Sequence, residues 1–451
     1  MHKSHSVECD NGRECDILYV DNFNNFYLYA EVARSSAHRW FFIVFSRDKA
    51  KECQRRGLSY HLMPRSMSLL VSDEYRKHES EYKKSIGRDR VLRHYPYEIA
   101  RRIIDTQLTV FSGLVQRLNP KIVLGEISWA NEHAFYRWST RNGYRYRHIL
   151  NLPLAKNKIV MFDDAHSYKS ISENPETLND SSEEEVSYYS LCEKLKKHNA
   201  AEKYSISRSV RNLFNVDGQL RDYRRNSFYY KGYGIAKIAY RKFYGRIRRS
   251  KAYAATYDQL VTMVAGRKII YMPLHIQPEA TPDFVAEESN DQFEIAEKIL
   301  AATDEGYVLV IKDHPNAFSI RDPFKLSRLL ATGRVVYANR NISSSVIIKI
   351  SYAVATIAGT AALEAISAGI PAIVFSDIFY SYSQFVYKVE DFSKLTSLLE
   401  SFSSVNVFND LHLDGFGVLG FVHDPTIFPE VTTPANIRCI NTLIDRFIEK
   451  M

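Results

Sequence analysis

The chain has 451 residues, of which 45% are hydrophobic and 25% charged, and its formal net charge is +8. This length exceeds one ordinary core and predicts two domains of about 200 residues, and the composition excludes a disordered chain. The sequence shows neither an 18-residue apolar run nor the apolar centre of a signal peptide near its start. We therefore expect a cytoplasmic protein that at most binds peripherally to the inner face of the cell membrane.

The cysteines are few and scattered, and none forms a CxxC pair or a Cys/His cluster with zinc-ligand spacing. A reduced protein without a metal site or a bound cofactor is the simplest interpretation. The positive net charge favours anionic ligands such as phosphorylated metabolites, acidic lipid head groups or nucleic acid.

The N-terminal part begins with a β-α-β pattern. Residues 15–20 (CDILYV) and 40–46 (WFFIVFS) are predicted buried strands, with a helix over 31–38 between them. The pattern carries no GxGxxG, so a dinucleotide site has no support. Residues 75–105 mix acids and bases at helical spacing, which is typical of a solvated helical hairpin.

The next predicted strand, residues 121–126 (KIVLGE), ends at Glu126 and precedes a helix over 129–141. Ligands of open α/β sheets gather beyond the carboxyl ends of the strands. Glu126 therefore has two interpretations: a carboxylate that stabilises the helix N-terminus, or an active-site acid, base or nucleophile.

Two segments of opposite charge follow. Residues 167–187 are acidic and without periodicity, which predicts a surface loop. Residues 221–251 are rich in Lys, Arg and Tyr, which fits an anionic membrane surface, the wall of a cleft that grips a polyanionic acceptor, or a solvated helix pair. No nucleic-acid-binding signature accompanies them, so we expect no nucleic-acid partner.

From residue 268 the sequence alternates regularly between strand and helix patterns. Predicted strands cover 268–274, 307–311, 334–337, 352–357 and 371–375, and residues 253–266 are expected to connect the two domains. The predicted domains are an acceptor-side domain over 1–255 and a nucleotide-binding domain over 256–432. A terminal helix within 433–451 is expected to cross back to the first domain.

Two groups of polar residues follow strands of this second domain. Lys312, Asp313 and His314 are predicted to lie just past the strand that begins at residue 307, and Gly359 and Thr360 open a helix after the strand 352–357. Backbone N–H groups, a hydroxyl and cationic side chains suit an anionic phosphate. Both groups therefore point to one crevice.

Glu364, one turn into the helix after Gly359, is placed either to bind ribose hydroxyls or to offset the helix dipole. The stretch HIQPEATPDF over 275–284 follows another strand, and its prolines predict a rigid loop that presents His275, Gln277 and Glu279.

In combination these motifs resemble a known family. KDHP at 312–315, GTAALEAISAGIPAIVF at 359–375, HIQPEATP at 275–282 and LGEISWANEH at 124–133 are similar to stretches of bacterial capsule polysaccharide synthesis proteins, a group that includes Kdo transferases. The resemblance implies an α/β protein of the GT-B type, with two Rossmann-like domains that face a central cleft. It further implies a metal-independent glycosyltransferase that uses a nucleotide-sugar donor, often a CMP-linked acidic sugar, and a surface polysaccharide or glycolipid acceptor.

The resemblance also implies roles for individual residues. The catalytic residues would be Glu126 and His314, the donor would be bound by Lys312, His314, Ser343, Ser344, Gly359, Thr360 and Glu364, and the cleft would be lined by His275, Gln277 and Glu279. The alternatives are a nucleotide-sugar epimerase or a polyol-phosphate polymerase of the same architecture, and a non-catalytic scaffold that binds a lipid-linked glycan.

Overall fold

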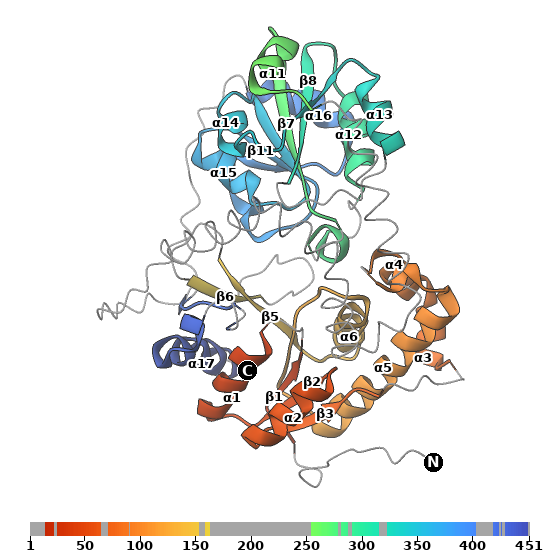
Figure 1. The fold of residues 1–451 in the computed structure, drawn as a ribbon, viewed down its shortest axis with the longest axis vertical. Helices are drawn as coiled ribbons and strands as arrows, with labels where there is room; N and C mark the ends of the chain where they lie inside the picture. The colour runs from red at the N-terminus through yellow and green to blue at the C-terminus, as the bar shows by residue number, and fades with distance from the viewer. Residues whose placement is uncertain are drawn as a thin grey trace, which may run out of the picture.

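The structure is a computed structural model of the chain. It describes residues 14–21, 25–64, 71–89, 91–152, 158–162, 254–277, 281–286, 291–314, 323–402, 418–423, 425 and 429–449. The predicted acidic segment 167–187 and the basic segment 221–251 lie outside the described residues. The described residues form two lobes stacked along the long axis of the molecule, each a sheet covered by helices (Figure 1).

The first domain contains a seven-stranded sheet with the order β13-β6-β5-β4-β1-β2-β3. The strands from β3 to β5 are parallel, whereas β6 and β13 are antiparallel to their neighbours. The strands are β1 (Ile17–Val20), β2 (Trp40–Val44), β3 (Ser59–Leu62), β4 (Ile122–Leu124), β5 (Tyr146–Asn151), β6 (Lys158–Phe162) and β13 (Val418–Leu419).

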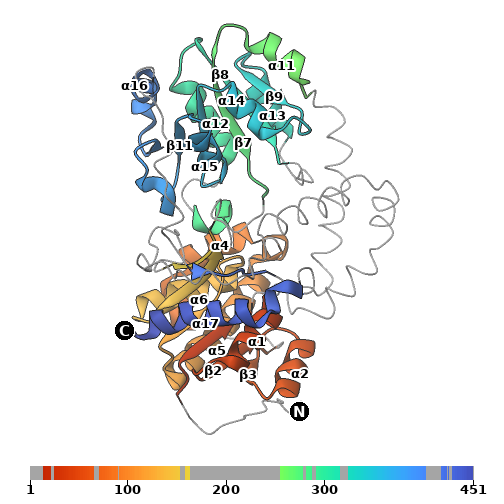
Figure 2. The same ribbon diagram turned by 90° about the vertical axis from the view of Figure 1, so that its left-hand side faces the viewer.

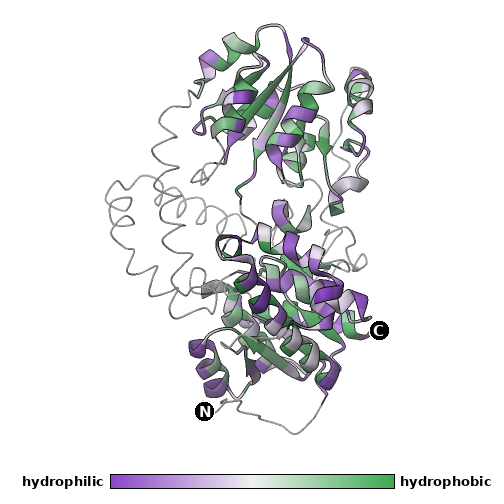
Figure 3. Cartoon of the chain, turned by 90° about the vertical axis from the view of Figure 1, so that its right-hand side faces the viewer, coloured by the Kyte–Doolittle hydropathy of each residue, from purple (hydrophilic) through white to green (hydrophobic). Residues whose placement is uncertain are grey.

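The strands of this sheet are hydrophobic because both faces are covered. Leu18 and Val20 of β1 belong to a core cluster with helices on one face, and Ile17 and Tyr19 belong to a separate cluster on the other face. The strands of both sheets are accordingly mostly hydrophobic along their length, while many outward helix positions are hydrophilic (Figure 3).

Helices from both ends of the chain cover the first sheet. The C-terminal helix α17 packs beside α1 in the lower lobe (Figures 1 and 2), where Asn441 Nδ2 donates to Val32 O (3.3 Å) and to Ser35 Oγ (2.9 Å). The helices are α1 (Phe26–Ser35), α2 (Arg47–Arg56), α3 (Asp73–Lys77), α4 (Glu79–Arg88), η1 (Leu92–His94), α5 (Tyr97–Leu118), α6 (Ala130–Arg141), η9 (Pro429–Thr432) and α17 (Pro434–Glu449).

The second domain contains a six-stranded parallel sheet with the order β12-β11-β10-β7-β8-β9. Its strands are β7 (Lys268–Leu274), β8 (Tyr307–Asp313), β9 (Val335–Ala338), β10 (Ala353–Thr356), β11 (Ala372–Val374) and β12 (Val386–Lys388). Its helices are α11 (Tyr257–Val264), η3 (Thr281–Val285), α12 (Gln292–Ala301), α13 (Pro323–Leu330), α14 (Ser344–Lys349), α15 (Ala361–Ser367), η5 (Phe379–Tyr382), η6 (Phe392–Lys394) and α16 (Leu395–Ser401).

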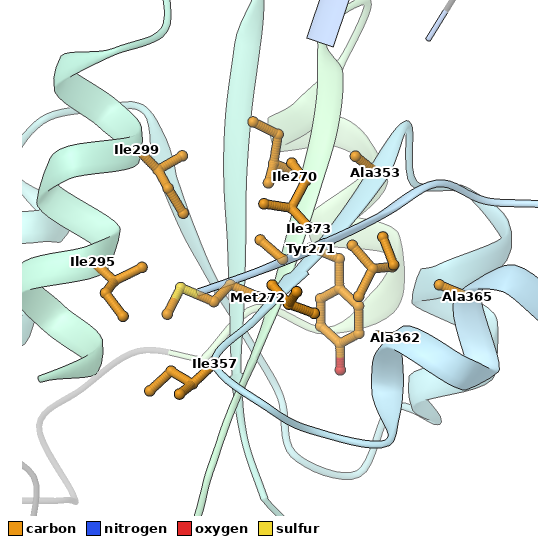
Figure 4. Close-up of a cluster of buried hydrophobic side chains, with 14 of the residues drawn as sticks. Ile270, Tyr271, Met272, Ile295, Ile299, Ala353, Ile357, Ala362, Ala365 and Ile373 are labelled. Carbon is orange, nitrogen blue, oxygen red and sulfur yellow. The ribbon is translucent and has the colours of Figure 1, made fainter. Parts of the chain in front are cut away.

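The core of the second domain also lies on both faces of its sheet. Consecutive residues of β7 point to opposite faces: Met272 lies toward Ile295 of α12, and Tyr271 lies toward Ala362 of α15 (Figure 4). This period-two alternation between two apolar layers is what a central parallel strand requires.

Both domains are doubly wound. In chain order within each domain, the parallel strands are arranged 3-2-1-4-5 in the first sheet and 3-2-1-4-5-6 in the second, which is the Rossmann arrangement. The predicted fold class, α/β with two Rossmann-like domains of GT-B-like architecture, is confirmed. The predicted interdomain connection over 253–266 contains a helix, because Thr256 forms a capping box with Gln259 and starts α11.

Aromatic contacts join the two domains. Phe284 of η3 is buried in the core cluster of the first domain, with its ring centroid 5.6 Å from that of His133 in α6. Conversely, Phe162 of the first-domain strand β6 belongs to the core cluster of the second domain, and its ring centroid lies 5.8 Å from that of Phe379 in η5. Since η3 follows β7 and α6 follows β4, the carboxyl ends of both sheets meet at this interface.

In the described part of the chain, no helix has the length and apolarity needed to cross a membrane.

A buried ion pair supports the carboxyl end of β1. Asp21 is fully buried directly after this strand, and Lys49 Nζ of α2 lies 2.8 Å from its Oδ1. Lys49→Met leaves the buried carboxylate without its cation, so we expect the free energy of unfolding to fall by about 3–5 kcal/mol in urea titrations. The double variant Asp21→Asn/Lys49→Met should regain most of the loss. A single variant as stable as the wild type would contradict this assignment.

Candidate active site at two topological switch points

Each doubly wound sheet has one position where consecutive connections leave toward opposite faces, and ligands bind in the crevice at this topological switch point. The first-domain switch point lies between β1 and β4, and the second-domain switch point lies between β7 and β10. These two places are therefore where functional side chains are expected.

A hydrogen bond spans the first-domain switch point. Glu126 follows β4, and its Oε1 accepts from Nδ2 of Asn25, the N-cap of α1 beyond β1, at 3.0 Å. Its Oε2 accepts from Ser128 Oγ at 3.3 Å. Both carboxylate oxygens are thus held in place, while the side chain stays partly exposed.

The backbone at Glu126 is fixed by a close approach. Tyr146 of β5 donates its hydroxyl to Glu126 O at 2.9 Å, and this hydroxyl lies so near Gly125 that a Cβ there would collide with it. A larger residue at position 125 would therefore displace the Tyr146 hydroxyl that holds the Glu126 backbone. Helix α6 begins at Ala130 with Trp129 as its N-cap, rather than being capped by the Ser128 hydroxyl, and the Ser128 N–H instead donates to Glu132 Oε2 at 2.6 Å.

A similar hydrogen bond spans the second-domain switch point. His275 directly follows β7, and its Nε2 lies 3.0 Å from the Oγ1 of Thr356, the last residue of β10. Thr356 Oγ1 also accepts from the Gly359 N–H at 3.2 Å. A Cβ on Gly359 would lie 2.8 Å from His275 Cε1 and 2.7 Å from Thr356 Oγ1. The imidazole therefore rests on a bare glycine backbone.

The other residues predicted for this site belong to the segments that follow β7 and β10. Thr360 is the exposed N-cap of α15 and its side chain makes no capping hydrogen bond. Glu364 is exposed on the same helix. Gln277 Nε2 donates to Asp283 Oδ1 at 2.9 Å. Glu279 lies outside the described residues.

The predicted end of β8 is wrong. The strand continues through Asp313, and Lys312 and Asp313 pair with Pro273 and Leu274 of β7. Lys312 is 3% exposed and its Nζ donates to Ile342 O and to Ser344 Oγ, both at 2.8 Å. These partners allow a lysine to be buried inside a strand, so only His314, which is exposed, lies past its end.

A tyrosine that the sequence analysis missed joins this group. The Tyr271 hydroxyl donates to Ser344 Oγ at 3.2 Å, so Lys312, Ser344 and Tyr271 meet at the start of α14. The pKa of Tyr271 is raised. Burial is the main cause and the nearby Glu364 carboxylate adds to it, while the hydrogen bond with Ser344 offsets a part. Ser343 is the exposed N-cap of α14, and its Oγ lies 2.8 Å from that of Ser345.

Other candidates for chemistry are less suitable. Burial raises the pKa of the Cys15 and Cys53 thiols to about 12, so neither is a ready nucleophile. Across the described residues, no group of three or more His, Cys, Asp or Glu side chains is arranged to hold a metal ion. Of the side chains that span the switch points, Thr356 ends β10 and Asn25 is the N-cap of α1, so a polar residue at a predicted strand end or helix start is the sequence signal for them.

Comparisons with known proteins give distant structural likenesses only. No protein-family model matches the sequence, and no curated protein matches it either. Among solved structures, the chain is similar to a KpsC beta Kdo 2,7 transferase of Thermosulfurimonas dismutans (13% identity, TM-score 0.33, 78% of this chain and 83% of that one). It is also similar to a putative UDP-N-acetylglucosamine 2-epimerase of Listeria monocytogenes (12%, 0.25, 89% and 93%) and a glycosyltransferase of Rickettsia africae (10%, 0.27, 97% and 98%). At these TM-scores the likenesses carry no weight for the chemistry.

Proposed function

We propose that the chain is a metal-independent glycosyltransferase that moves a sugar from a nucleotide-sugar donor to a glycan or glycolipid acceptor. The observation that carries this proposal is the placement of two switch points, one in each Rossmann-like domain, toward one interface. A group transfer needs two ligands that meet, and each switch point is a ligand crevice with its own polar side chains.

The donor belongs at the second-domain switch point. A phosphate at this place would meet the His275 ring, the Gly359 backbone and the exposed Thr360, with His314 one strand away beyond β8. Imidazole and backbone donors supply the charge stabilisation that a departing nucleotide needs. Lys312 then acts through Ser344 by holding the start of α14. The sequence motifs at 275–282, 312–315 and 359–375 support the same assignment. Because the family that they resemble often uses CMP-linked acidic sugars, a CMP-linked acidic sugar such as Kdo is the donor that we propose.

The acceptor belongs at the first-domain switch point. Glu126 is fixed there by Asn25 and Ser128, so its carboxylate is positioned to deprotonate an acceptor hydroxyl, or to attack the sugar carbon if configuration is retained. A carboxylate, an amide and a hydroxyl together suit the hydroxyl groups of a sugar. The resemblance of the sequence motifs supports a bacterial surface polysaccharide or its lipid-linked form as the acceptor, and such an acceptor would bring the enzyme to the inner face of the membrane.

Nucleotide binding is the first test of the function. The proposal predicts that one or more of CMP, UDP, GDP and CDP raises the unfolding temperature of the full chain, because a ligand that binds only the folded state stabilises it. The corresponding nucleotide sugar should then transfer its sugar to a glycan acceptor, as seen by mass spectrometry. Binding without transfer would favour a scaffold, and a changed sugar without acceptor would favour an epimerase.

Gly359→Ala tests the donor site. The new Cβ would displace His275 and Thr356, so we expect nucleotide affinity to fall at least about tenfold in calorimetric titrations. Gly87→Ala on α4 is the matched control, because a Cβ there meets nothing within 4 Å. Unchanged affinity in a folded Gly359→Ala variant would remove this position from the site.

Glu126→Gln tests the acceptor side. The amide keeps the size of the side chain but cannot take up a proton, so the transfer rate should fall by about 10²–10⁴-fold while nucleotide affinity stays at the wild-type value. Steady-state kinetics and calorimetry on the same preparation separate the two effects. A loss of nucleotide affinity with unchanged turnover would instead make Glu126 a structural carboxylate.

A further inference from the structure

Gln292 is a buried glutamine whose side chain points back to the end of β7. It is 2% exposed and is the first residue of α12. The helix start is fixed by Asp291, which accepts from the N–H groups of Phe293 (3.0 Å) and Glu294 (3.1 Å) and pairs with Lys325. The Gln292 side chain therefore extends from a rigid position.

The Gln292 amide pairs with the backbone of His275 at two points. The His275 N–H donates to Gln292 Oε1 at 2.6 Å, and Gln292 Nε2 donates to His275 O at 3.2 Å. The last residue of β7 that pairs with β8 is Leu274, and the pairing of β7 with β10 ends at Tyr271. The backbone of His275 thus lies past the last pairs of the sheet, and the amide supplies the partners that a neighbouring strand would give.

The same amide extends toward the domain interface. Gln292 Nε2 also donates to Gln277 Oε1 at 2.6 Å, and Gln277 in turn donates to Asp283. The next residue, Phe284, is the one that packs on His133 of the first domain. One side chain therefore links the backbone of His275 to the segment that touches the opposite domain.

We infer that Gln292 is a positioning residue that holds the His275 imidazole in the proposed donor site. This inference rests on the proposed function. The ring of His275 is confined between Thr356 Oγ1 and the Gly359 backbone, so a small shift of its backbone removes the imidazole from its place over the crevice. Binding groups of this kind must be held to within about 0.5 Å, and residues behind them set that precision.

Gln292→Glu is the sharpest variant, because it keeps the size of the side chain and replaces the donating NH₂ group with an oxygen. The new carboxylate can still accept from the His275 N–H. Its second oxygen, however, cannot donate to His275 O and Gln277 Oε1, which are themselves acceptors. Gln107→Glu is the matched control, since Gln107 on α5 is a fully buried glutamine of the other domain.

The test measures the affinity of the folded full-length variants for CMP, UDP, GDP and CDP by calorimetry. Gln292→Glu should lower the affinity for the nucleotide that binds the wild type at least about tenfold, and Gln107→Glu should lower it by less than about twofold. In a His275→Ala background, Gln292→Glu should add less than about twofold, because both changes remove the same contact. Additive losses, or wild-type affinity in Gln292→Glu, would overturn the positioning role.

A readout without ligand separates this inference from the proposed function. In ¹⁵N-histidine spectra, with the His275 signals identified by their loss in His275→Ala, Gln292→Glu should shift the ring nitrogens of His275 and Gln107→Glu should leave them in place. Unshifted His275 signals in Gln292→Glu would overturn the inference. If the signals shift while no nucleotide binds the wild type, the proposed function fails and the positioning of His275 stands.

Discussion

The constraint on which this structure depends is that its central strands are buried on both faces. A parallel strand in this position needs helices above and below, so the connections must leave toward opposite faces at one place in each sheet. Between β1 and β4, and again between β7 and β10, that reversal separates the following loops, and this is the place where open α/β sheets form a ligand crevice. The location of both crevices follows from burial alone, before any functional side chain is considered.

Polar backbone and side-chain groups at these crevices lie past the last strand pairs, where burial demands hydrogen-bond partners. The fold meets this demand with side chains: Asn25 on Glu126 in the first domain, and Thr356 and Gln292 on His275 in the second. The hydrogen bonds that complete the sheet ends therefore also hold the side chains that a ligand would meet in the proposed site. The same hydrogen bonds thus complete the fold and preorganise the proposed site.

This explains what the sequence could and could not predict. Strand β7 was predicted with its observed bounds, because a short apolar run before a Pro-rich loop is a local signal. The end of β8 was misplaced because Lys312 looks like a surface residue until Ile342 and Ser344 are known to receive its ammonium. Gln292 gave no signal at all. Its partners lie 15 and 17 residues earlier and meet it only through the tertiary fold.

The two crevices are related through helix α6. Its first turn carries Glu132, which holds the Ser128 backbone beside Glu126, and its next residue is His133, on which Phe284 packs. The His133 ring is itself held by Ser85 Oγ at 2.8 Å, so the contact surface is rigid on the first-domain side. Any rotation of the second domain about this contact must move His275 relative to Glu126. In the proposed enzyme, the approach of a donor to an acceptor would therefore be governed by the same helix that positions the Glu126 carboxylate.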